Sequence, residues 1–260
     1  MEFNISGVFG KKRMTLLVWI ITFSILGSIG AIAGAALMLL FPENTRSTLL
    51  PHLISYATGT LLGAAFLGMI PKALQHATPM AVSGTVLAGI VLFFILEKLV
   101  IWRHCHDEAC EVHSTRGPLI LIGDAFHNFV DGFVIAAAFF TSIPFGIAAS
   151  LAVIAHEIPQ EVGDFAILLE SGYSRAKALF LNTLSSLTTL PGAVAAYFFL
   201  GKMQEAIPYI LAFSAASFIY IATADLVPGL HRTTGVKPAL LQFTLMVAGI
   251  GTIGLFQFAQ

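Results

Sequence analysis

The chain has 260 residues, of which 57% are hydrophobic and only 10% are charged, against about 25% charged residues in an ordinary soluble domain. Its mean hydropathy of +0.88 excludes a soluble protein with a large apolar core and indicates an integral membrane protein. The formal net charge is −1 and no basic tract could bind nucleic acid, so we expect the lipid bilayer, and not a nucleic acid, as a partner.

Eight apolar runs follow one another, each long enough to cross about 30 Å of hydrocarbon. Only helices and closed barrels satisfy their backbone hydrogen bonds in lipid, and these runs lack the alternation of barrel strands. We therefore predict an all-α membrane protein with eight transmembrane helices. The connections are short, which predicts a single transmembrane domain over residues 1–260, without a separate soluble domain. The expected spans are residues 14–40, 49–71, 79–102, 118–142, 145–170, 176–200, 207–229 and 236–258.

The first run follows a basic cluster, Lys11-Lys12-Arg13, as the core of a signal peptide would. It extends from Met14 to Leu40, which is too long for a signal peptide, so we expect a retained first helix. If both termini are outside, the inner segments contain eight Lys and Arg residues and the outer segments five. The N-terminal cluster alone favours the opposite orientation. The overall bias predicts a multi-pass protein of the cell membrane with both termini outside.

The segment between the third and fourth spans, residues 103–117, concentrates metal-binding side chains. Two cysteines so close together do not make a disulfide framework, and the segment lacks the second ligand pair of a zinc finger. An ordinary solvated loop is the alternative, but the density of ligands favours weak metal contacts on the cytoplasmic side. The candidate contacts are His104, Cys105, His106, Cys110 and His113.

The fourth and fifth spans contain acidic residues without any basic residue. A carboxylate at the middle of a bilayer costs at least about 2.5–3.5 kcal/mol, so a cluster of them requires positive charge from elsewhere. Histidine nitrogens with carboxylate and amide oxygens suit a divalent transition-metal ion. We predict that the missing cation is the substrate. Between Gly117 and Ser174 the acids are Asp124, Asp131, Glu157, Glu161, Asp164 and Glu170, and Lys and Arg are absent.

Helical spacing gathers the polar side chains of each span on one face. His127 and Asp131 are four residues apart, and His156 and Gln160 repeat this spacing in the next span. A single intramembrane histidine or acid is commonly a packing residue, but nine polar side chains in two helices favour an ion path. The predicted metal ligands are His127, Asn128, Asp131, His156, Glu157, Gln160 and Glu161, while Asp124 and Asp164 are expected to orient a histidine or to form a gate.

Pro159 lies inside the fifth span, between His156 and Gln160. Its ring removes a backbone hydrogen bond and leaves the carbonyl of Ala155 without its usual donor. Transporters expose carbonyls to a cation at such interruptions, and a simple packing kink is an equal alternative for this proline alone.

Two functions fit a metal cluster inside the membrane: transport of the ion, and intramembrane metal-dependent hydrolysis. The segment His156-Glu157-Ile158-Pro159-Gln160 has a superficial similarity to the H-E-x-x-H pattern of zinc proteases. However, its last position is Gln, a proline interrupts the helix, and the ligands exceed what a hydrolase with an open coordination position needs. We therefore expect a transporter without enzymatic activity and without a cofactor beyond the transported ion.

At these residues the chain resembles the ZIP (Zrt/Irt-like) family of divalent metal transporters. The fourth span reads Gly123-Asp124-x-x-His127-Asn128-x-x-Asp131-Gly132, and the fifth reads His156-Glu157-x-Pro159-x-Glu161-x-Gly163-Asp164. The closest branch has H-E-x-P-H-E-x-G-D in its fifth span. The resemblance implies import of zinc, or else of Fe²⁺, Mn²⁺ or Cd²⁺, into the cytoplasm.

The same resemblance implies a 3+2+3 arrangement of eight helices, inverted-repeat symmetry, a site between helices four and five, and often a homodimer. No internal repeat is detectable in the sequence. By the family pattern, one metal ion is held by His127, Asp131, His156 and the position of Gln160, and Asn128 and Glu157 face a second ion.

The chain departs from the family pattern at several positions. Gln160 replaces a His or Glu, and Gly68 and Lys72 replace a His and a Glu near the end of the second span. Leu190 and Gly229 stand where acids are common in the sixth and seventh spans. Because these changes remove ligands at the entrance and exit, we expect one principal metal site.

Overall fold

A computed structural model describes residues 5–102, 112–231 and 235–258 of the chain. These residues form helices joined by short turns, with no strand in the described ranges, which confirms the all-α prediction. The elements are α1 (Ile5–Leu40), α2 (Glu43–Gly63), a π-helical turn η1 (Ala64–Met69), α3 (Ile70–Leu74), α4 (Pro79–Trp102), α5 (Val112–Thr141), α6 (Ile143–Glu170), α7 (Arg175–Ser186), α8 (Thr189–Lys202), a 3₁₀ turn η2 (Gln204–Ala206), α9 (Ile207–Tyr220), a second π-helical turn η3 (Ile221–Leu226), α10 (Val227–Leu230) and α11 (Val236–Phe258).

Each of the eight predicted spans is helical, and three of them consist of more than one segment. The second span is α2, η1 and α3, the sixth is α7 and α8, and the seventh is α9, η3 and α10. Helix α5 begins before the predicted span, because an apolar run marks only the part of a helix that lies in hydrocarbon. The first turns of α5 therefore fall within the predicted loop 103–117.

Seven of the eight helical stretches are long and apolar enough to cross a membrane: residues 14–40, 47–74, 79–96, 120–141, 175–202, 204–230 and 236–255. The remaining stretch is α6, which contains the polar residues of the predicted fifth span. It packs between α1, α2 and α5. A helix enclosed by other helices need not be apolar on every face, which explains why composition alone does not select it.

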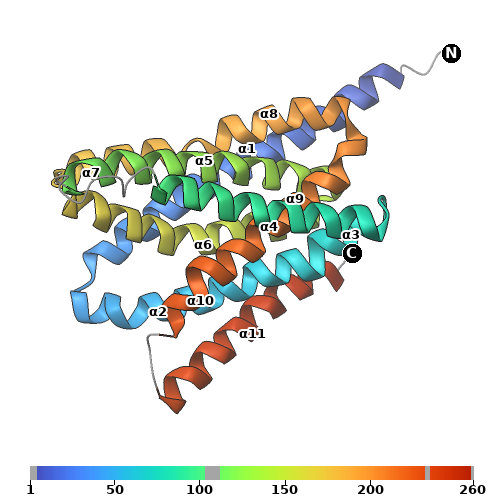
Figure 1. Ribbon diagram of the computed structural model, residues 1–260. Coiled ribbons are helices and arrows are strands. Elements are labelled where there is room, and N and C mark those ends of the chain that lie inside the picture. Colours follow the sequence, from blue (N-terminus) through green and yellow to red (C-terminus); the bar gives the residue numbers. More distant parts are fainter. Residues whose placement is uncertain (1–4, 103–111, 232–234, 259–260) are drawn as a thin grey trace.

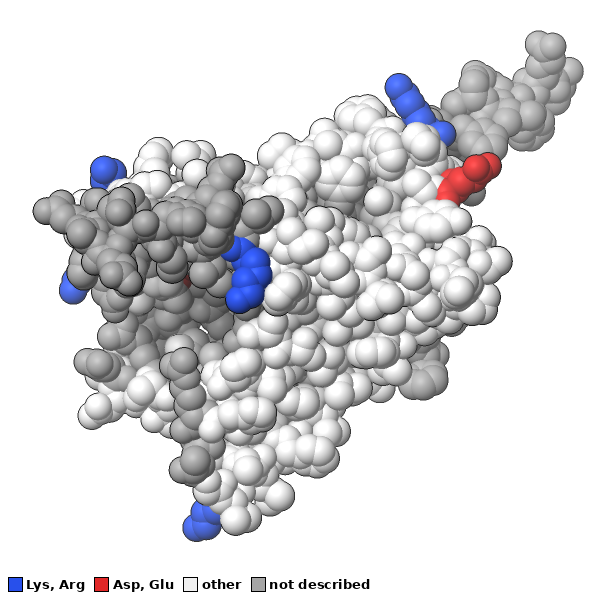
Figure 2. Space-filling view, viewed as in Figure 1, with Lys and Arg blue, Asp and Glu red and all other residues white. Residues whose placement is uncertain are grey.

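The outside of the bundle is apolar and its charges lie near its ends. Figure 2 shows one face on which the charged side chains gather towards the extremities, with an uncharged surface between them. Large apolar side chains are exposed on several helices, including Leu87 of α4, Phe180 of α7 and Phe243 of α11, each about two thirds exposed (64%, 66% and 64%). This distribution suits a protein surrounded by lipid. Helix α1 begins, and α11 ends, at the same end of the bundle (Figure 1), which corresponds to an even number of crossings.

The helix pairing has an internal symmetry that the sequence does not reveal. Helix α4 packs on α9 as α11 packs on α2, and α1 packs on α6 as α8 packs on α5. Likewise, α2 contacts α6 and α9 contacts α5. Exchanging the first three spans with the last three, and the fourth with the fifth, reproduces these pairings. The contacts therefore follow a 3+2+3 arrangement with α5 and α6 at its centre (Figure 1).

The two π-helical turns occupy matching places in this symmetry. Turn η1 belongs to the second span and η3 to the seventh, and each is followed within two residues by a proline, Pro71 and Pro228. Turn η1, in the second span, contacts α9 of the seventh span, and η3, in the seventh span, contacts α2 of the second span. Turn η1 also contacts α6, and η3 also contacts α9, the helix that it follows. π-Helical turns are rare and frequently lie near functional sites.

Glycines bring α8 very close to α5. A Cβ atom on Gly132 would overlap the carbonyl oxygen of Thr189, and one on Gly192 would overlap the carbonyl oxygen of Phe129. Small residues commonly permit such close approach between membrane helices. The contact holds Thr189 against the polar face of α5.

Candidate metal site

The polar faces of α5 and α6 meet in the interior of the bundle. The two helices follow each other through a one-residue turn at Ser142 and run antiparallel. Helix α6 continues without a break across Pro159, so the predicted interruption is limited to the backbone hydrogen bond that a proline removes. The acidic side chains are buried, with exposed fractions of 4% for Asp124, 0% for Asp131, 2% for Glu157, 0% for Glu161 and 6% for Asp164.

Four side chains place one ligand atom each in a tight group. The Nε2 atoms of His127 and His156 are 3.2 Å apart. Oδ2 of Asp131 lies 3.2 Å from Nε2 of His156 and 3.8 Å from Nε2 of His127. Oε1 of Glu157 lies 3.3 Å from Nε2 of His127 and 3.4 Å from Nε2 of His156. Two nitrogens and two oxygens therefore converge on one point between α5 and α6.

The spacing of this group matches the coordination shell of a small divalent ion. A tetrahedral zinc ion with ligand distances of about 2.0–2.1 Å has ligand atoms about 3.3–3.4 Å from one another. The five measured separations, from 3.2 to 3.8 Å, lie around this value. The arrangement of the four atoms is therefore compatible with a tetrahedral ion at their centre.

A backbone hydrogen bond orients one of the imidazoles. Nδ1 of His156 is 3.0 Å from the carbonyl oxygen of Ala152. A carbonyl oxygen can only accept, so Nδ1 carries the proton, and in the neutral ring Nε2 keeps its lone pair for the group. Metal-binding histidines are typically fixed in this way by a partner on the other nitrogen. Sequence spacing did not reveal this contact because the acceptor belongs to the backbone.

The carboxylates of the site have few protein partners. Within the described residues, both oxygens of Asp131, Glu157 and Glu161 lack a hydrogen-bond partner. The ion-pair partners that the structure gives Asp131 and Glu157 are histidine nitrogens. Buried polar atoms are normally satisfied, and unsatisfied ones require an explanation such as a bound ion.

A second acidic group adjoins the first. Asp124, Glu157 and Glu161 bring one carboxylate oxygen each within 4.8 Å of one another. Glu157 belongs to both groups and connects them. The predicted residues therefore form two neighbouring sets of ligands, the first with two nitrogens and the second with oxygens only.

The two amide residues lie between these groups and hold Asp124. Nδ2 of Asn128 donates to Oδ1 of Asp124 at 2.9 Å, and Nε2 of Gln160 donates to the same oxygen at 3.2 Å. Oδ1 of Asn128 accepts a hydrogen bond of 2.9 Å from the hydroxyl of Thr189. Both amides thus support the acidic group through their nitrogens, and a role as metal ligands stays a prediction.

Polar residues of α7 and α8 complete the surroundings of the site and were missed in the sequence. Asn182, Ser185, Ser186 and Thr189 are at most 5% exposed, although they lie in a predicted lipid-spanning run. Their spacing of three, four and seven residues is the helical signal that could have identified them. They were overlooked because none of them is charged.

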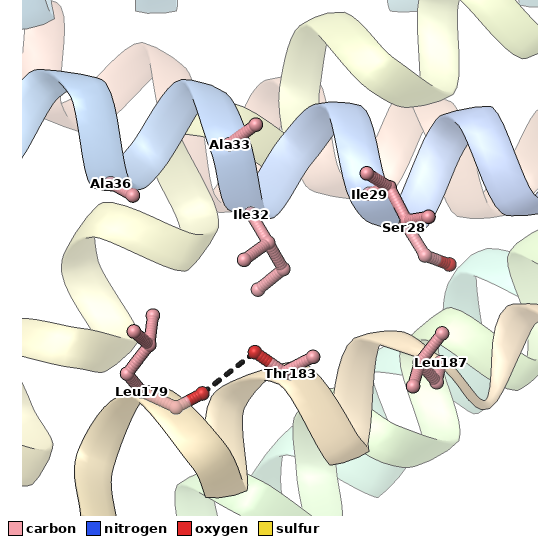
Figure 3. A pocket seen from close by; sticks show the side chains of 8 residues that line it. All are labelled: Ser28, Ile29, Ile32, Ala33, Ala36, Leu179, Thr183 and Leu187. Carbon is pink, nitrogen blue, oxygen red and sulfur yellow. Dashed lines mark hydrogen bonds between the residues drawn. The ribbon is translucent and has the colours of Figure 1, made fainter. Parts of the chain in front are cut away.

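Other predicted contacts are not brought to this site. His104, Cys105, His106 and Cys110 lie outside the described residues, and for His113 only the backbone, in the first turn of α5, is described. A separate apolar groove of about 260 Å³ lies between α1 and α7 (Figure 3). Its hydroxyl groups are already paired, Thr183 with the carbonyl of Leu179 and Ser28 with that of Ser186, so it offers no ligands to a metal ion.

Comparisons with known proteins identify the family of the chain. A family model described as ZIP Zinc transporter matches residues 102–257. The zinc transporter ZIP13 of Pongo abelii is 33% identical over 222 residues, which are 80% of this chain and 66% of that protein. The zinc transporter ZIP13 of Danio rerio is 28% identical over an aligned length of 305 residues, with 91% and 87% of the two chains covered. The zinc transporter ZIP4 of Homo sapiens is 40% identical over 136 residues, or 52% of this chain and 20% of that protein.

The chain thus spans about two thirds of the Pongo abelii protein and a fifth of the human one. The family match covers more than half of the chain and includes both helices that form the metal-binding group. The chain therefore belongs to the ZIP zinc transporter family.

Proposed function

We propose that this protein carries a divalent transition-metal ion, zinc before all others, across the membrane and into the cytoplasm. The ion would bind His127, Asp131, His156 and Glu157 midway along its path. The observation that carries the proposal is the convergence of four ligand atoms, at the spacing of a tetrahedral ion, in the interior of an apolar helical bundle. Membership of a family of zinc transporters gives independent support.

The electrostatics of the bundle also support a cation as substrate. Five buried carboxyl groups lie on α5 and α6, and neither of these spans contains Lys or Arg between residues 117 and 174. A divalent ion at the junction of the two helices would neutralise Asp131 and Glu157 together. Intramembrane acids of this kind typically mark ion pathways.

The proposed mechanism is an exchange of ligands. A hydrated ion exchanges its water molecules for the two histidines and two carboxylates, and Glu161 adds negative charge beside them. Binding must remain moderate, because a site that holds the ion as tightly as a structural zinc site would not release it. The neutral amides of Asn128 and Gln160, next to this site, are proposed as weaker ligands during passage.

Zinc is the proposed substrate because the curated relatives are named zinc transporters and because the group has tetrahedral spacing. Mixed nitrogen and oxygen ligands also bind Fe²⁺, Mn²⁺ and Cd²⁺, and selectivity among these ions depends on geometry. The relatives and the geometry give no support to the hydrolase alternative. Gln160, at the position of the second histidine of the protease pattern, contacts Asp124 and not the metal-binding group.

Further features of the proposal concern the setting of the protein in the membrane. We place both termini outside the cell membrane, which follows the positive-inside bias of the connecting segments. The residues His104 to His113 would receive the ion on the cytoplasmic side. The protein is proposed to form a homodimer, as the family resemblance implies.

The decisive experiment is uptake of ⁶⁵Zn²⁺ and of a panel of divalent ions by proteoliposomes that contain the purified chain. We expect concentration-dependent zinc uptake that His127→Ala abolishes. The matched control is His76→Ala, which removes an exposed histidine after α3 and should leave uptake unchanged. Uptake that survives His127→Ala at the wild-type rate would contradict the proposed site, and metal-dependent peptide cleavage without any uptake would replace transport by hydrolysis.

A further inference from the structure

Helix α7 presents a buried amide and a buried hydroxyl group to the acidic face of α6. Asn182 is 2% exposed, and its Nδ2 donates to the backbone oxygen of Glu161 at 3.2 Å, which fixes the side chain against α6. Its Oδ1 atom has no hydrogen-bond partner within the described ranges. The hydroxyl of Ser186, one turn further along α7, is also buried and lies where it can donate to the carboxyl group of Glu161.

Three carboxyl groups share this place. Asp124, Glu161 and Asp164 are at most 6% exposed, and each has at least one oxygen without a hydrogen-bond partner in the described structure. Glu161 and Asp164 are three residues apart on α6 and therefore neighbours on its surface. Asp124, from α5, brings an oxygen within 4.8 Å of one from Glu161. Buried carboxyl oxygens of α5 and α6 thus face one another, and Ser186 of α7 adjoins them.

This group lies further along the bundle than the histidines. Asp164 follows His156 by eight residues, or about 12 Å along α6, and Asp124 precedes His127 by three residues, or about 4.5 Å along α5. Because the helices are antiparallel, both displacements lead towards the end of the bundle where α6 ends and α7 begins (Figure 1).

We propose that Asp124, Glu161, Asp164, Asn182 and Ser186 form a second station for a divalent cation, built from oxygen atoms alone. The inference rests on the proposed transport function, since it assigns the ligands that receive the ion when it leaves the histidines. Carboxylate, amide and hydroxyl oxygens suit harder divalent ions such as Mn²⁺ better than a nitrogen-containing site does. A transition-metal ion is held less firmly by such a set, which favours its onward release.

Packing alone does not account for these residues. In a packing cluster the donors and acceptors pair with one another, as the amides of Asn128 and Gln160 do with Oδ1 of Asp124. The remaining oxygens of the group outnumber their donors in the part of the chain that the structure describes, where Ser186 offers one hydroxyl beside Glu161. A bound cation would supply the positive charge that these lone pairs lack.

The test uses Mn²⁺ as the probe and the purified full chain in lipid nanodiscs. Bound Mn²⁺ is counted from the loss of the free-ion signal in electron paramagnetic resonance. The measurement is made in a His127→Ala background, in which the histidine site is disabled. We expect this protein to bind one Mn²⁺ per chain. Adding both Glu161→Gln and Asp164→Asn should abolish the binding, while Glu205→Gln, at an exposed acid of η2, should leave it unchanged.

Asn182 provides a pair of variants with opposite expected effects. Asn182→Leu should weaken Mn²⁺ binding about tenfold, and Asn182→Asp, which is nearly isosteric, should tighten it about tenfold. Both variants lose the hydrogen bond to the backbone of Glu161, so misfolding cannot produce opposite signs. Absence of Mn²⁺ binding in the His127→Ala background, or equal binding by the Asn182 variants, would overturn the station. Zinc uptake by the wild-type protein tests the transport function separately, so the transport proposal and the second cation station can each fail without the other.

Discussion

Replacing Glu161 by Gln should stabilise the metal-free protein. Glu161 is fully buried, both of its carboxyl oxygens lack a hydrogen-bond partner among the described residues, and the carboxyl groups of Asp124 and Glu157 lie within 4.8 Å of it. Gln has nearly the same shape but no charge, so the substitution opens no cavity and removes one buried anion.

The expected gain can be worked out from two effects. The Gln amide can donate to neighbouring carboxyl oxygens that lack a donor, and a buried polar group without a partner costs about 1–3 kcal/mol. Two like charges within 4.8 Å repel by at least about 3.5 kcal/mol at an effective dielectric constant of 20, and uptake of a proton by the carboxyl group relieves this repulsion in the wild type. We therefore expect Glu161→Gln to stabilise the metal-free protein by about 1–3 kcal/mol, and each kcal/mol corresponds to about 2–4 °C in Tm for a chain of this size.

The assay is thermal unfolding of the purified protein in EDTA, followed by near-ultraviolet circular dichroism. Glu205→Gln is the matched control, because this acid is exposed and its substitution should change stability by less than about 0.5 kcal/mol. A divalent ion should stabilise the wild type more than Glu161→Gln, since the variant has lost a ligand. If Glu161→Gln has a lower Tm than the wild type in EDTA, the carboxyl group is stabilised by the fold itself and the reasoning is refuted.

Three other changes have expected outcomes. Gln160→His should tighten zinc binding about tenfold in a titration, because it supplies an imidazole next to the metal-binding group. The control Gln75→His, at an exposed position, should leave the zinc affinity unchanged, and an unchanged affinity of Gln160→His would count against Gln160 as a ligand. Gly192→Ala should destabilise the protein by about 1–3 kcal/mol in thermal unfolding, since its Cβ would overlap the carbonyl of Phe129. Gly163→Ala, at a position with open space around it, should be tolerated, and equal Tm values for the two variants would refute the close contact of α5 and α8. Adding zinc at about 100 times its Kd should stabilise the wild type by about 2.7 kcal/mol, and no change in Tm would show that the folded protein does not bind it.

The sequence predicts the helices of this protein well because hydrocarbon leaves few alternatives. The predicted span 79–102 coincides with α4 (Pro79–Trp102). The π-helical turns could not be predicted, since η1 is as apolar as the helices around it and η3 contains only Thr223 and Asp225 besides apolar residues, which does not distinguish a π-helical turn from an α-helix. The symmetric pairing of helices was also invisible, because it depends on contacts between segments and leaves no detectable repeat of residue types.

The candidate site was predictable as two faces but not as a set of contacts. Spacing placed His127 with Asp131 and His156 with Gln160, and the structure has each pair on one helix. It could not give the register between α5 and α6, which brings Glu157 to the histidines and directs Gln160 to Asp124. Register depends on how the buried side chains of two helices interdigitate, and periodicity within one helix carries no information about it.

The π-helical turns η1 and η3 give the second and the seventh span the same capacity for local rearrangement of the helix. A π-helical turn contains one residue more than the surrounding α-helix needs, and that surplus can shift along the chain as neighbouring hydrogen bonds exchange. Each shift by one position rotates the intervening residue by about 100° and moves it about 1.5 Å along the axis. The side chains at η1 and η3 can therefore be reoriented while the segments on either side keep their places and the number of backbone hydrogen bonds stays constant. Since the two turns are related by the internal symmetry, a rotation available at one side of the bundle is equally available at the other.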